Sequence, residues 1–501
     1  GVWNFAKLNA QADAIAHCLQ IAGVKQGDLV AMHIERGAHA VAAILGITAL
    51  GAGYVPLDPA YPATRNAFIL RDSGAKLVLV DDGGQHALAS IGDQTARQIN
   101  IAEIAPALGK FTPPKLTAPD SAPAYMMYTS GSTGTPKGVL IEQRAVLRLA
   151  LGEDYAKIGP DDVVAQAGPL AFDASTFEIW VTLLRGAQIA VIDRNDLLDP
   201  VKFAEALSRF AVSKMFMSVG LFNRQIDHNP QSLGGLKTLM IGGDAISKSH
   251  VRNFISQCPN VTVLNGYGPT ESTTFAVVGP ITKDDLSGDT DNTILGRPIG
   301  FTKTLIVDGN GKPAPIGVWG ELLIGGARLA REYWQRPELT RERFIPDPDQ
   351  PGERLYRSGD LARWTLDGRI EFGGRRDNQI KLRGFRIELD EIEQQLLSAP
   401  DMRNAIVLFD AKAPDGGAII ACVQIGQPGT ATNLNDADIR TMAEWLGGRL
   451  PGYMIPSKWY IVDTIPITAN GKVDRKALLE TVRVQANILT LENGAGTPPV
   501  N

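Results

Sequence analysis

Tyr128-Thr-Ser-Gly-Ser-Thr-Gly-Thr-Pro-Lys-Gly-Val139 follows the apolar segment Ala124–Met127 and combines three glycines, several hydroxyl side chains and one lysine. Glycines let a backbone turn tightly and direct its N–H groups inward, hydroxyl groups add hydrogen-bond donors, and lysine adds positive charge. This combination predicts a loop that holds a polyphosphate. The loop is not a Walker A motif, because Pro136 precedes Lys137 where that motif requires glycine. The alternative is a Ser/Gly-rich surface turn.

The composition is that of a globular protein: of 501 residues, 44% are hydrophobic and 21% charged, which predicts two to four domains. A net charge of −5 argues against a nucleic acid or a membrane surface as partner. No apolar run approaches the ~18–20 residues that span a bilayer. Cys18, Cys258 and Cys422 form no CxxC pair, so we expect packing roles and a reducing, cytoplasmic location. The histidines lack metal-binding spacing, and the start at Gly1 predicts an excised domain.

Strands and helices alternate over the first 290 residues, which predicts an α/β fold with doubly wound, mostly parallel sheets. The helical patterns cover 5–24 and 38–50, and the strand patterns cover 28–33, 77–80, 163–165, 188–192, 214–217, 238–241 and 261–264. From about 290 to 376, strands with nearby turn signals predict a β-rich subdomain, at 303–307, 320–324 and 369–372. Ile345–Glu353 is expected to be a loop within it.

A domain boundary is expected near Asp377, so that residues 1–376 form the core. Residues 377–482 then form a small, mobile α+β lid, and 483–501 a flexible tail. The lid pattern combines strands at 405–409 and 419–425 with helices at 390–398 and 437–449.

In its order and spacing, the loop at 128–139 resembles the phosphate loop of the adenylate-forming superfamily. This superfamily includes acyl-CoA synthetases, luciferases and the adenylation domains of nonribosomal peptide synthetases. The resemblance covers nearly the whole chain and includes Leu50–Asp58, for which we expect a structural role only. It implies ATP as cosubstrate, with Thr129 and Lys137 catalytic. The implied phosphate contacts are Thr129, Ser130, Gly131, Ser132, Thr133 and Gly134.

Asn265-Gly-Tyr-Gly-Pro-Thr-Glu271 follows a predicted strand, and α/β sheets bind ligands at the carboxyl ends of strands. The resemblance implies that Tyr267 stacks on adenine and that Glu271 binds Mg²⁺, which suits a metal that takes one or two carboxylates plus phosphate oxygens. A plain β-turn at Gly268-Pro269 is the alternative. The other implied nucleotide contacts are Gly242, Asp244, Asn265, Gly266, Gly268 and Thr270.

Two further motifs would complete the nucleotide site. Tyr356–Leu361 resembles the family's ribose motif, in which Asp360 accepts hydrogen bonds from both ribose hydroxyls. Gly374–Gly384 resembles the hinge motif: Arg375 would reach the ribose or the phosphates, Asp377 would be the pivot, and Lys381 would lie on the lid. We expect Arg376 to be solvated.

Asn470-Gly-Lys-Val-Asp-Arg475 resembles the family's C-terminal lysine motif. Asn-Gly predicts a tight turn that presents Lys472. Most lysines in turns only add solubility, but the match implies that Lys472 is catalytic and contacts both nucleotide and substrate.

Phe172-Asp-Ala-Ser175 separates the subfamilies. A buried substrate ammonium is costly unless it is paired, and Asp173 would pair with it. The alternative is a helix-capping Asp173 before a helix at 175–184. By resemblance, Phe172 and Asp173 would contact the substrate, and the rest of its pocket would consist of Ala174, Phe177, Phe216, Met240, Gly242, Gly266, Thr274 and Phe275. These apolar walls favour a branched aliphatic amino acid, Val or Ile.

The resemblance therefore implies a nonribosomal-peptide-synthetase adenylation domain, as in antibiotic biosynthesis. It would form an aminoacyl-adenylate, release pyrophosphate, and pass the amino acid to the phosphopantetheine thiol of a carrier protein. Ile241–Ala245 has alanine where a carrier motif needs serine, so the carrier would be elsewhere. The need for an MbtH-like helper protein is left open. An acyl- or aryl-CoA ligase and a non-catalytic binding module are the alternatives.

The chain also departs from the family pattern. The usual Gly-Leu-Ala-Arg-Gly-Tyr reads Ala327-Arg-Leu-Ala-Arg-Glu-Tyr333 here, with Glu332 in place of a glycine. Ser358 replaces the commoner threonine.

Overall fold

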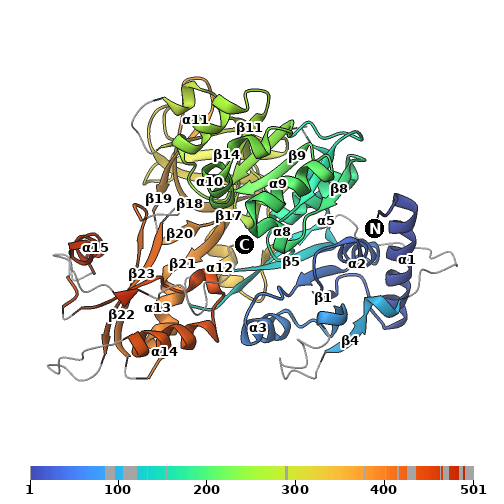
Figure 1. Cartoon of the computed structure of the whole chain (residues 1–501), viewed down its shortest axis with the longest axis horizontal. Helices are drawn as coiled ribbons and strands as arrows, with labels where there is room; N and C mark the ends of the chain where they lie inside the picture. Colours follow the sequence, from blue (N-terminus) through green and yellow to red (C-terminus); the bar gives the residue numbers. More distant parts are fainter. Residues whose placement is uncertain are drawn as a thin grey trace.

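The computed structural model confirms the α/β prediction, with a large domain and a smaller, C-terminal one beside it (Figure 1). It describes residues 2–84, 96–104, 121–131, 134–152, 155–287, 292–376, 378–400, 402–413, 417–425, 436–462, 464–466, 473–484 and 489–490. Over these residues, no helix has both the length and the apolar character needed to cross a membrane.

The first sheet of the large domain has the strand order β16-β6-β5-β2-β1-β3-β4. Its strands are β1 (Leu29–His33), β2 (Gly53–Pro56), β3 (Leu77–Val80), β4 (Arg97–Asn100), β5 (Pro123–Thr129), β6 (Lys137–Glu142) and β16 (Glu332–Tyr333). The pairs β1–β2, β1–β3, β2–β5 and β3–β4 are parallel, whereas β6 is antiparallel to β5 and β16. The helix α1 (Phe5–Ile21) precedes β1, whereas α2 (Ala38–Ala49) and α3 (Ala63–Ser73) connect parallel strands. Gly74 ends α3 at a φ of 69° that favours glycine.

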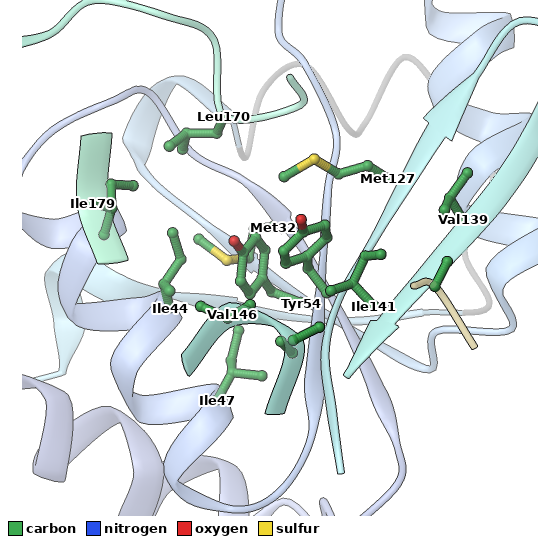
Figure 2. Packing of buried hydrophobic residues seen from close by; sticks show 14 of the residues in the cluster. Met32, Ile44, Ile47, Tyr54, Met127, Val139, Ile141, Val146, Leu170 and Ile179 are labelled. Carbon is green, nitrogen blue, oxygen red and sulfur yellow. The ribbon is translucent and has the colours of Figure 1, made fainter. Parts of the chain in front are cut away.

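Apolar side chains from this sheet and from α2 form one core (Figure 2). Tyr54 and Tyr125 are completely buried in it, with ring centroids 5.5 Å apart. Met127 and Val139 come from the strands on either side of the phosphate loop, so this core fixes both ends of the loop.

The second sheet has the order β14-β15-β18-β19-β13-β12-β11-β10-β9-β7-β8, and β17 pairs with β18. Its parallel strands are β7 (Val163–Gln166), β8 (Gln188–Val191), β9 (Lys214–Ser218), β10 (Thr238–Gly242) and β11 (Thr262–Tyr267). Its antiparallel strands are β12 (Val277–Pro280), β13 (Thr293–Pro298), β14 (Thr302–Val307), β15 (Gly320–Gly326), β17 (Phe344–Pro346), β18 (Arg354–Trp364) and β19 (Ile370–Arg375). The strands expected to form a β-rich subdomain thus belong to the same sheet as the parallel strands, joined to them by β13 and β12. The predicted domain boundaries stay predictions.

The other helices of the large domain connect strands of the second sheet or, as α5 and α12 do, link the two sheets (Figure 1). They are α5 (Gln143–Leu151), α6 (Ala174–Thr176), α7 (Thr182–Leu184), α8 (Arg194–Leu198), α9 (Pro200–Arg209), α10 (Val219–His228), α11 (Lys248–Gln257) and α12 (Pro337–Arg343). A π-helical turn, Phe177–Val181, joins α6 to α7, so the helix expected at 175–184 is present but irregular. The short 3₁₀ turns are Ile101–Glu103, Pro230–Leu233, Thr270–Ser272, Asp284–Leu286 and Gly452–Met454.

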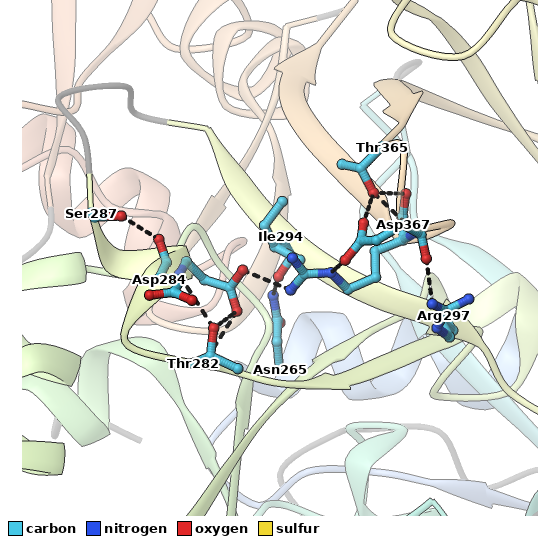
Figure 3. A network of polar contacts seen from close by, with 10 residues as sticks. Asn265, Thr282, Asp284, Ser287, Ile294, Arg297, Thr365 and Asp367 are labelled. Atoms are coloured by element: carbon cyan, nitrogen blue, oxygen red, sulfur yellow. Dashed lines mark hydrogen bonds and ion pairs between the residues drawn. The ribbon is translucent and has the colours of Figure 1, made fainter.

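A polar network holds the end of β11 against its neighbours (Figure 3). Asn265 donates to the Ile294 carbonyl at 2.8 Å, and Thr282 donates to Asp285 at 2.7 Å. Arg369 donates to the same Asp285 at 2.6 Å and thereby ties the turn after β12 to the turn before β19. The Asn265 bond links β11 to β13, whereas the Asp285 bonds hold the turns beside them.

The small domain contains the hairpin β20 (Gln379–Leu382) and β21 (Phe385–Glu388) and a sheet of order β22-β23-β24-β25. The sheet strands are β22 (Met402–Asp410), β23 (Ala418–Ile425), β24 (Lys458–Ile461) and β25 (Leu489–Thr490). Its helices are α13 (Leu389–Leu397), α14 (Asp436–Gly447) and α15 (Arg475–Val484). This domain has a hydrophobic core of its own, which includes Ile387, Ile392, Leu396 and Trp459. We call it the lid.

Two local predictions were wrong. The strand expected at 261–264 continues to Tyr267, because its second half pairs with β12, so Asn265-Gly-Tyr lies inside the strand. The loop expected at Ile345–Glu353 begins with strand residues, because Ile345 and Pro346 pair with β18.

Candidate active site

The phosphate loop connects two antiparallel strands, since β5 ends at Thr129 and β6 begins at Lys137, directly opposite. The Thr129 hydroxyl oxygen is buried and has no hydrogen-bond partner among the described residues, although a buried polar atom normally has one. At Gly131 a Cβ atom would lie 2.0 Å from the Thr135 carbonyl oxygen, so only glycine fits. The loop therefore has an unused hydroxyl and a close-packed backbone, which suits a phosphate. Ser132 and Thr133 lie outside the described residues.

Lys137 and Glu271 lie side by side next to this loop. The Lys137 ammonium is 3.9 Å from Glu271 Oε1 and 4.6 Å from the centroid of the Tyr333 ring. The Tyr333 hydroxyl donates to Glu271 Oε1 at 2.6 Å. Burial, reinforced by Arg386, lowers the pKa of Lys137 to about 8, which leaves it mainly protonated at neutral pH. This pair can neutralise a polyphosphate and hold a cation.

The lid places a second cation on Glu271. Arg386, on β21, donates through Nη1 to Oε1 at 2.9 Å and to Oε2 at 2.6 Å. Burial alone would raise the pKa of Glu271, but Arg386 and Lys137 lower it to about 2. The Ser130 hydroxyl also donates to the Arg386 carbonyl at 2.8 Å.

A lid carboxylate lies on the phosphate loop itself. Glu391, in the first turn of α13, accepts a hydrogen bond from the Gly131 N–H at 3.2 Å and pairs with Arg65 of α3 at 3.0 Å. Both charged side chains of that pair are almost fully buried. A phosphate bound to the same N–H group would have to displace Glu391.

The predicted Mg²⁺ site does not fit a metal ion in this lid position. Both oxygens of Glu271 are bound by Arg386, and one also accepts from Tyr333. The described part of the chain contains no group of three or more His, Cys, Asp or Glu residues that could hold a metal. A metal on Glu271 therefore requires that Arg386 first move away.

A cavity of about 320 Å³ brings together residues predicted to bind the nucleoside. Asp360, at the edge of this region, accepts from Arg375 Nη1 at 2.6 Å and from the Tyr267 hydroxyl. The predicted residues that line the cavity are Asp244, Asn265, Gly266, Tyr267, Arg375 and Lys381. Arg375 and Asp360, each predicted to contact the nucleotide, therefore lie in direct contact, and their binding of a ribose stays a prediction.

The lid reaches this cavity as well. The Lys381 ammonium lies 5.2 Å from the centroid of the Tyr267 ring, and burial lowers its pKa. Burial raises the pKa of Asp244 to about 6. Hydrogen bonds from the backbone N–H groups of Ala245 and Arg383 to its carboxylate oppose this shift. At Gly243 a Cβ atom would lie 3.1 Å from Gly384 Cα, in the turn of the lid hairpin. The hairpin tip therefore packs on the rim of the nucleoside cavity.

Asp173 is buried just before α6, and its side chain makes no capping hydrogen bond to that helix. The helix-cap alternative therefore has no support in the structure. Burial raises the pKa of Asp173 to about 6, while a hydrogen bond with Thr270 opposes this shift. Thr274 donates to the Asp173 carbonyl at 2.8 Å. The positive charges of Lys381 and Arg386 also act on Asp173, but among the described residues neither forms an ion pair with it. A buried carboxylate in this setting is suited to bind the cation of a ligand.

The apolar residues predicted to line the pocket form one cluster beside Asp173. The Phe275 ring lies 5.6 Å from Phe216 and 5.7 Å from Phe177. Ala174 and Met240 belong to the same cluster. At Gly266 a Cβ atom would lie 2.8 Å from the Met240 sulfur and 2.9 Å from Phe275, and one at Gly242 would lie 2.2 Å from the Gly266 carbonyl oxygen.

Phe172, the remaining predicted pocket residue, lies toward the lid, 6.2 Å from the Phe385 ring. Gly268 and Gly134 are also required as glycines: a Cβ atom at Gly268 would lie 2.4 Å from the Thr274 carbonyl oxygen, and Gly134 has a φ of 73°. Lys472 and the hinge residue Asp377 lie outside the described residues.

The sequence did not identify four charged residues at the site: Arg65, Arg328, Arg386 and Glu391. Arg386 lies on the second strand of the lid hairpin and Glu391 in the helix that follows, and their charge was the available signal. A sequence does not show where a separate domain docks, so these two charged residues could not be assigned to the site from the sequence. Arg376, expected to be solvated, is half-exposed and lies 3.4 Å from Glu321.

Comparisons with known proteins identify the family of the chain. The family model described as "AMP-binding enzyme" matches residues 2–334, and "AMP-binding enzyme C-terminal domain" matches 391–472. Tyrocidine synthase 3 of Brevibacillus parabrevis is 39% identical over 474 residues, which is 95% of this chain and 7% of that protein. Gramicidin S synthase 2 of Brevibacillus brevis is 37% identical over 476 residues, which is 95% of this chain and 10% of that protein. The chain thus spans only a small part of either relative.

Among solved structures, the chain is similar to holo-PA1221, described as a nonribosomal peptide synthetase protein containing adenylation and PCP domains bound to a vinylsulfonamide inhibitor. The TM-score is 0.83 at 29% identity, over 96% of this chain and 80% of that one. It is also similar to holo-AB3403, described as a four-domain synthetase bound to AMP and glycine, with a TM-score of 0.66 and 31% identity over 95% of this chain and 34% of that one.

Proposed function

The chain belongs to the family of AMP-binding enzymes, and from this premise we propose that it is an adenylation domain that activates an amino acid with ATP. Members of this family are adenylate-forming ligases. The observation that carries the choice of an amino acid is Asp173, a buried carboxylate that caps no helix and lies beside the apolar cluster. An amino-acid ammonium would pair with this carboxylate, whereas a fatty or aryl acid would leave it unpaired.

The proposed substrate is a branched aliphatic amino acid, Val or Ile. Phe177, Phe216, Met240 and Phe275 provide only apolar surface to a side chain, and their rings shorten the space available. A charged substrate side chain among them would be buried without a partner. One methylene changes binding by only ~1–3 kcal/mol, so Val, Ile and Leu are expected to cross-react.

In the proposed first step, a carboxylate oxygen of the amino acid attacks the α-phosphorus of ATP and the bond to the pyrophosphate oxygen breaks. The products are the aminoacyl-adenylate and pyrophosphate, and no proton transfer is needed. The Thr129 hydroxyl, the loop N–H groups and Lys137 would hold the phosphates, while Asp360 and Arg375 would orient the ribose.

Mg²⁺ belongs to this proposal only for a lid position in which Arg386 has left Glu271. In that position Glu271 would be a single carboxylate ligand next to the phosphates, a coordination that Mg²⁺ accepts.

The second proposed step transfers the amino acid to a phosphopantetheine thiol of a carrier protein. The thiol sulfur attacks the acyl carbon, AMP leaves, and the thiol proton is released. The similarity to proteins described as containing adenylation and PCP domains supports a carrier partner. A cytoplasmic location stays an expectation, and the need for an MbtH-like helper stays open.

Amino-acid-dependent exchange of pyrophosphate into ATP tests the proposed function. A panel of amino acids, fatty acids and aryl acids should give the highest exchange with Val, Ile or Leu. Exchange that peaks on a fatty or aryl acid would establish the CoA-ligase alternative, and a lack of exchange with every acid would favour a binding module. A peak on an aromatic, charged or amide side chain would refute the aliphatic pocket.

The acid limb of the pH profile should come from Asp173. Only the deprotonated carboxylate pairs with an ammonium. With a pKa of about 6, Asp173 becomes protonated about two pH units above an ordinary aspartate. The kcat/KM for the amino acid should therefore fall about tenfold per unit as pH decreases below 6. Steady-state exchange from pH 5 to 8 measures this limb. Asp244→Asn should retain it, although burial also raises the pKa of Asp244 to about 6; loss of the limb in that variant would move the assignment to Asp244.

Lys472→Ala should reduce adenylate formation by roughly 10²-fold, the scale for loss of one charge partner in the transition state. This prediction rests on the sequence motif. Thiol transfer from preformed adenylate should change much less, and single-turnover assays of the two half-reactions measure the contrast. Equal losses in both half-reactions would count against a catalytic Lys472.

A further inference from the structure

Arg328 is a buried arginine next to the proposed substrate pocket, in the turn between β15 and β16. Its side chain is only 2% exposed, and its Nε atom has no hydrogen-bond partner. Burial lowers the pKa of Arg328 to about 10, opposed by nearby Tyr155, so the guanidinium stays charged at neutral pH. Among the described residues, no carboxylate forms an ion pair with it. A buried, unpaired arginine is costly, so its position needs an explanation.

The contacts of Arg328 are concentrated on the wall of the pocket. Nη1 donates to the Phe275 carbonyl at 3.3 Å, and Nη2 donates to the Gly300 carbonyl. The Arg328 carbonyl accepts from the Thr273 hydroxyl at 2.7 Å. Tyr155 packs against the same wall, with its ring 6.2 Å from that of Phe275.

The segment that Arg328 holds is conformationally strained. Thr273 and Thr274 have φ values of 59° and 71°, a left-handed conformation that is unfavourable for β-branched residues. Such residues keep this conformation only where the surroundings impose it. Here the Thr273 and Thr274 hydroxyls bond to the Arg328 and Asp173 carbonyls, and Arg328 binds the next residue, Phe275. The same turn thus links the pocket wall to the proposed ammonium site.

We propose that Arg328 is a positioning residue for amino-acid selectivity, which it exerts by clamping the strained Thr273–Phe275 turn and so fixing the Phe275 wall. The proposal rests on the proposed function, because selectivity means selection among amino acids. Arg328 touches the wall from outside and does not touch the substrate. Without the clamp, the turn can relax toward ordinary backbone angles, and the space beside Phe177 and Phe216 is no longer fixed.

Arg328→Met tests the proposal, because methionine retains most of the apolar volume and removes the donors. We expect the KM for the preferred aliphatic amino acid to rise about tenfold, with the KM for ATP within twofold of the parent. Discrimination between valine and phenylalanine, measured as the ratio of kcat/KM in pyrophosphate exchange, should fall about tenfold. Arg328→Lys, which restores charge and a donor, should recover part of that ratio.

Arg354→Met is the matched control. Arg354 also binds carbonyl groups of this segment, those of Ala330 and Arg331, both at 2.8 Å, and it does not contact the pocket wall. It should lower the Tm and leave the selectivity ratio unchanged. Equal changes in the ratio for both variants, or no change for Arg328→Met, would overturn the positioning role. A parent that prefers aspartate or glutamate would also overturn it, since Arg328 would then be a direct partner.

Crystal structures of the parent and of Arg328→Met separate this proposal from the proposed function. The Thr273–Thr274 backbone and the Phe275 ring should move in the variant. An unmoved wall overturns the positioning role even if exchange activity is present. A moved wall in a protein that exchanges with no amino acid supports the clamp and rejects the proposed function.

Discussion

Asp173→Ala is expected to lower kcat/KM for the amino acid by roughly 10²–10³-fold. The variant would bury the substrate ammonium without its partner, and breaking a buried pair costs about 3–5 kcal/mol, where each 1.36 kcal/mol is a factor of ten. Because the Asp173 side chain makes no capping hydrogen bond, we expect little loss of helix stability. Pyrophosphate exchange with the best amino acid measures the effect, and ATP binding measured by calorimetry should stay close to that of the parent.

Asp199→Ala provides the contrast, because Asp199 caps α9 by accepting from the Val201 and Lys202 N–H groups. It should lower the Tm and leave amino-acid activation unchanged. If Asp173→Ala behaved like Asp199→Ala, with activation within a few-fold of the parent, its role as the ammonium partner would be refuted.

Arg386→Ala is expected to reduce thiol transfer by roughly 10²–10³-fold and to change adenylate formation by only a few-fold. Arg386 and Glu271 form a buried pair between the lid and the core, with side chains 15% and 0% exposed. Removing the arginine leaves Glu271 without its closest cation in this lid position, at a cost of about 3–5 kcal/mol to docking. Transfer from preformed adenylate to a phosphopantetheine thiol measures one half-reaction, and pyrophosphate exchange measures the other.

Arg376→Ala is a suitable control, since Arg376 is half-exposed, its contact with Glu321 is long at 3.4 Å, and Glu321 keeps a closer partner in Arg357 at 2.7 Å. It should change neither half-reaction. If Arg386→Ala impaired adenylate formation as strongly as thiol transfer, the contact with Glu271 would belong to the first step, and this view of the docked lid would be wrong.

The sequence predicted best those features that depend on local spacing. The turn between Thr129 and Lys137 follows from local turn chemistry, and the structure places these two residues opposite each other. Asp360 and Arg375, each predicted to contact the nucleotide, lie in direct contact. The predicted pocket residues Phe216 and Met240 were chosen by family resemblance, and they lie opposite each other on neighbouring parallel strands.

Features that depend on packing between segments were beyond this kind of reasoning. Arg386 and Glu391 are charged residues near a hairpin, and only the docking of the lid brings them to Glu271 and Gly131. Arg328 lies in an irregular turn, where no periodicity shows which way a side chain points. The extension of β11 to Tyr267 depends on its pairing with β12, which follows only after an intervening turn.

The lid contacts on Gly131 and Glu271 have a consequence for the direction of the overall reaction. Glu391 brings a negative charge to the loop N–H group, and Arg386 brings a positive charge to Glu271, the carboxylate proposed to bind Mg²⁺, so under the proposed function the lid occupies the places of pyrophosphate and its metal. Pyrophosphate would then have to displace these two side chains before it could convert the adenylate back to ATP. When the carrier protein is scarce, the aminoacyl-adenylate would thus persist in the enzyme with the lid docked. Accumulated pyrophosphate would slow the docking of the lid and so expose the adenylate to the reverse reaction.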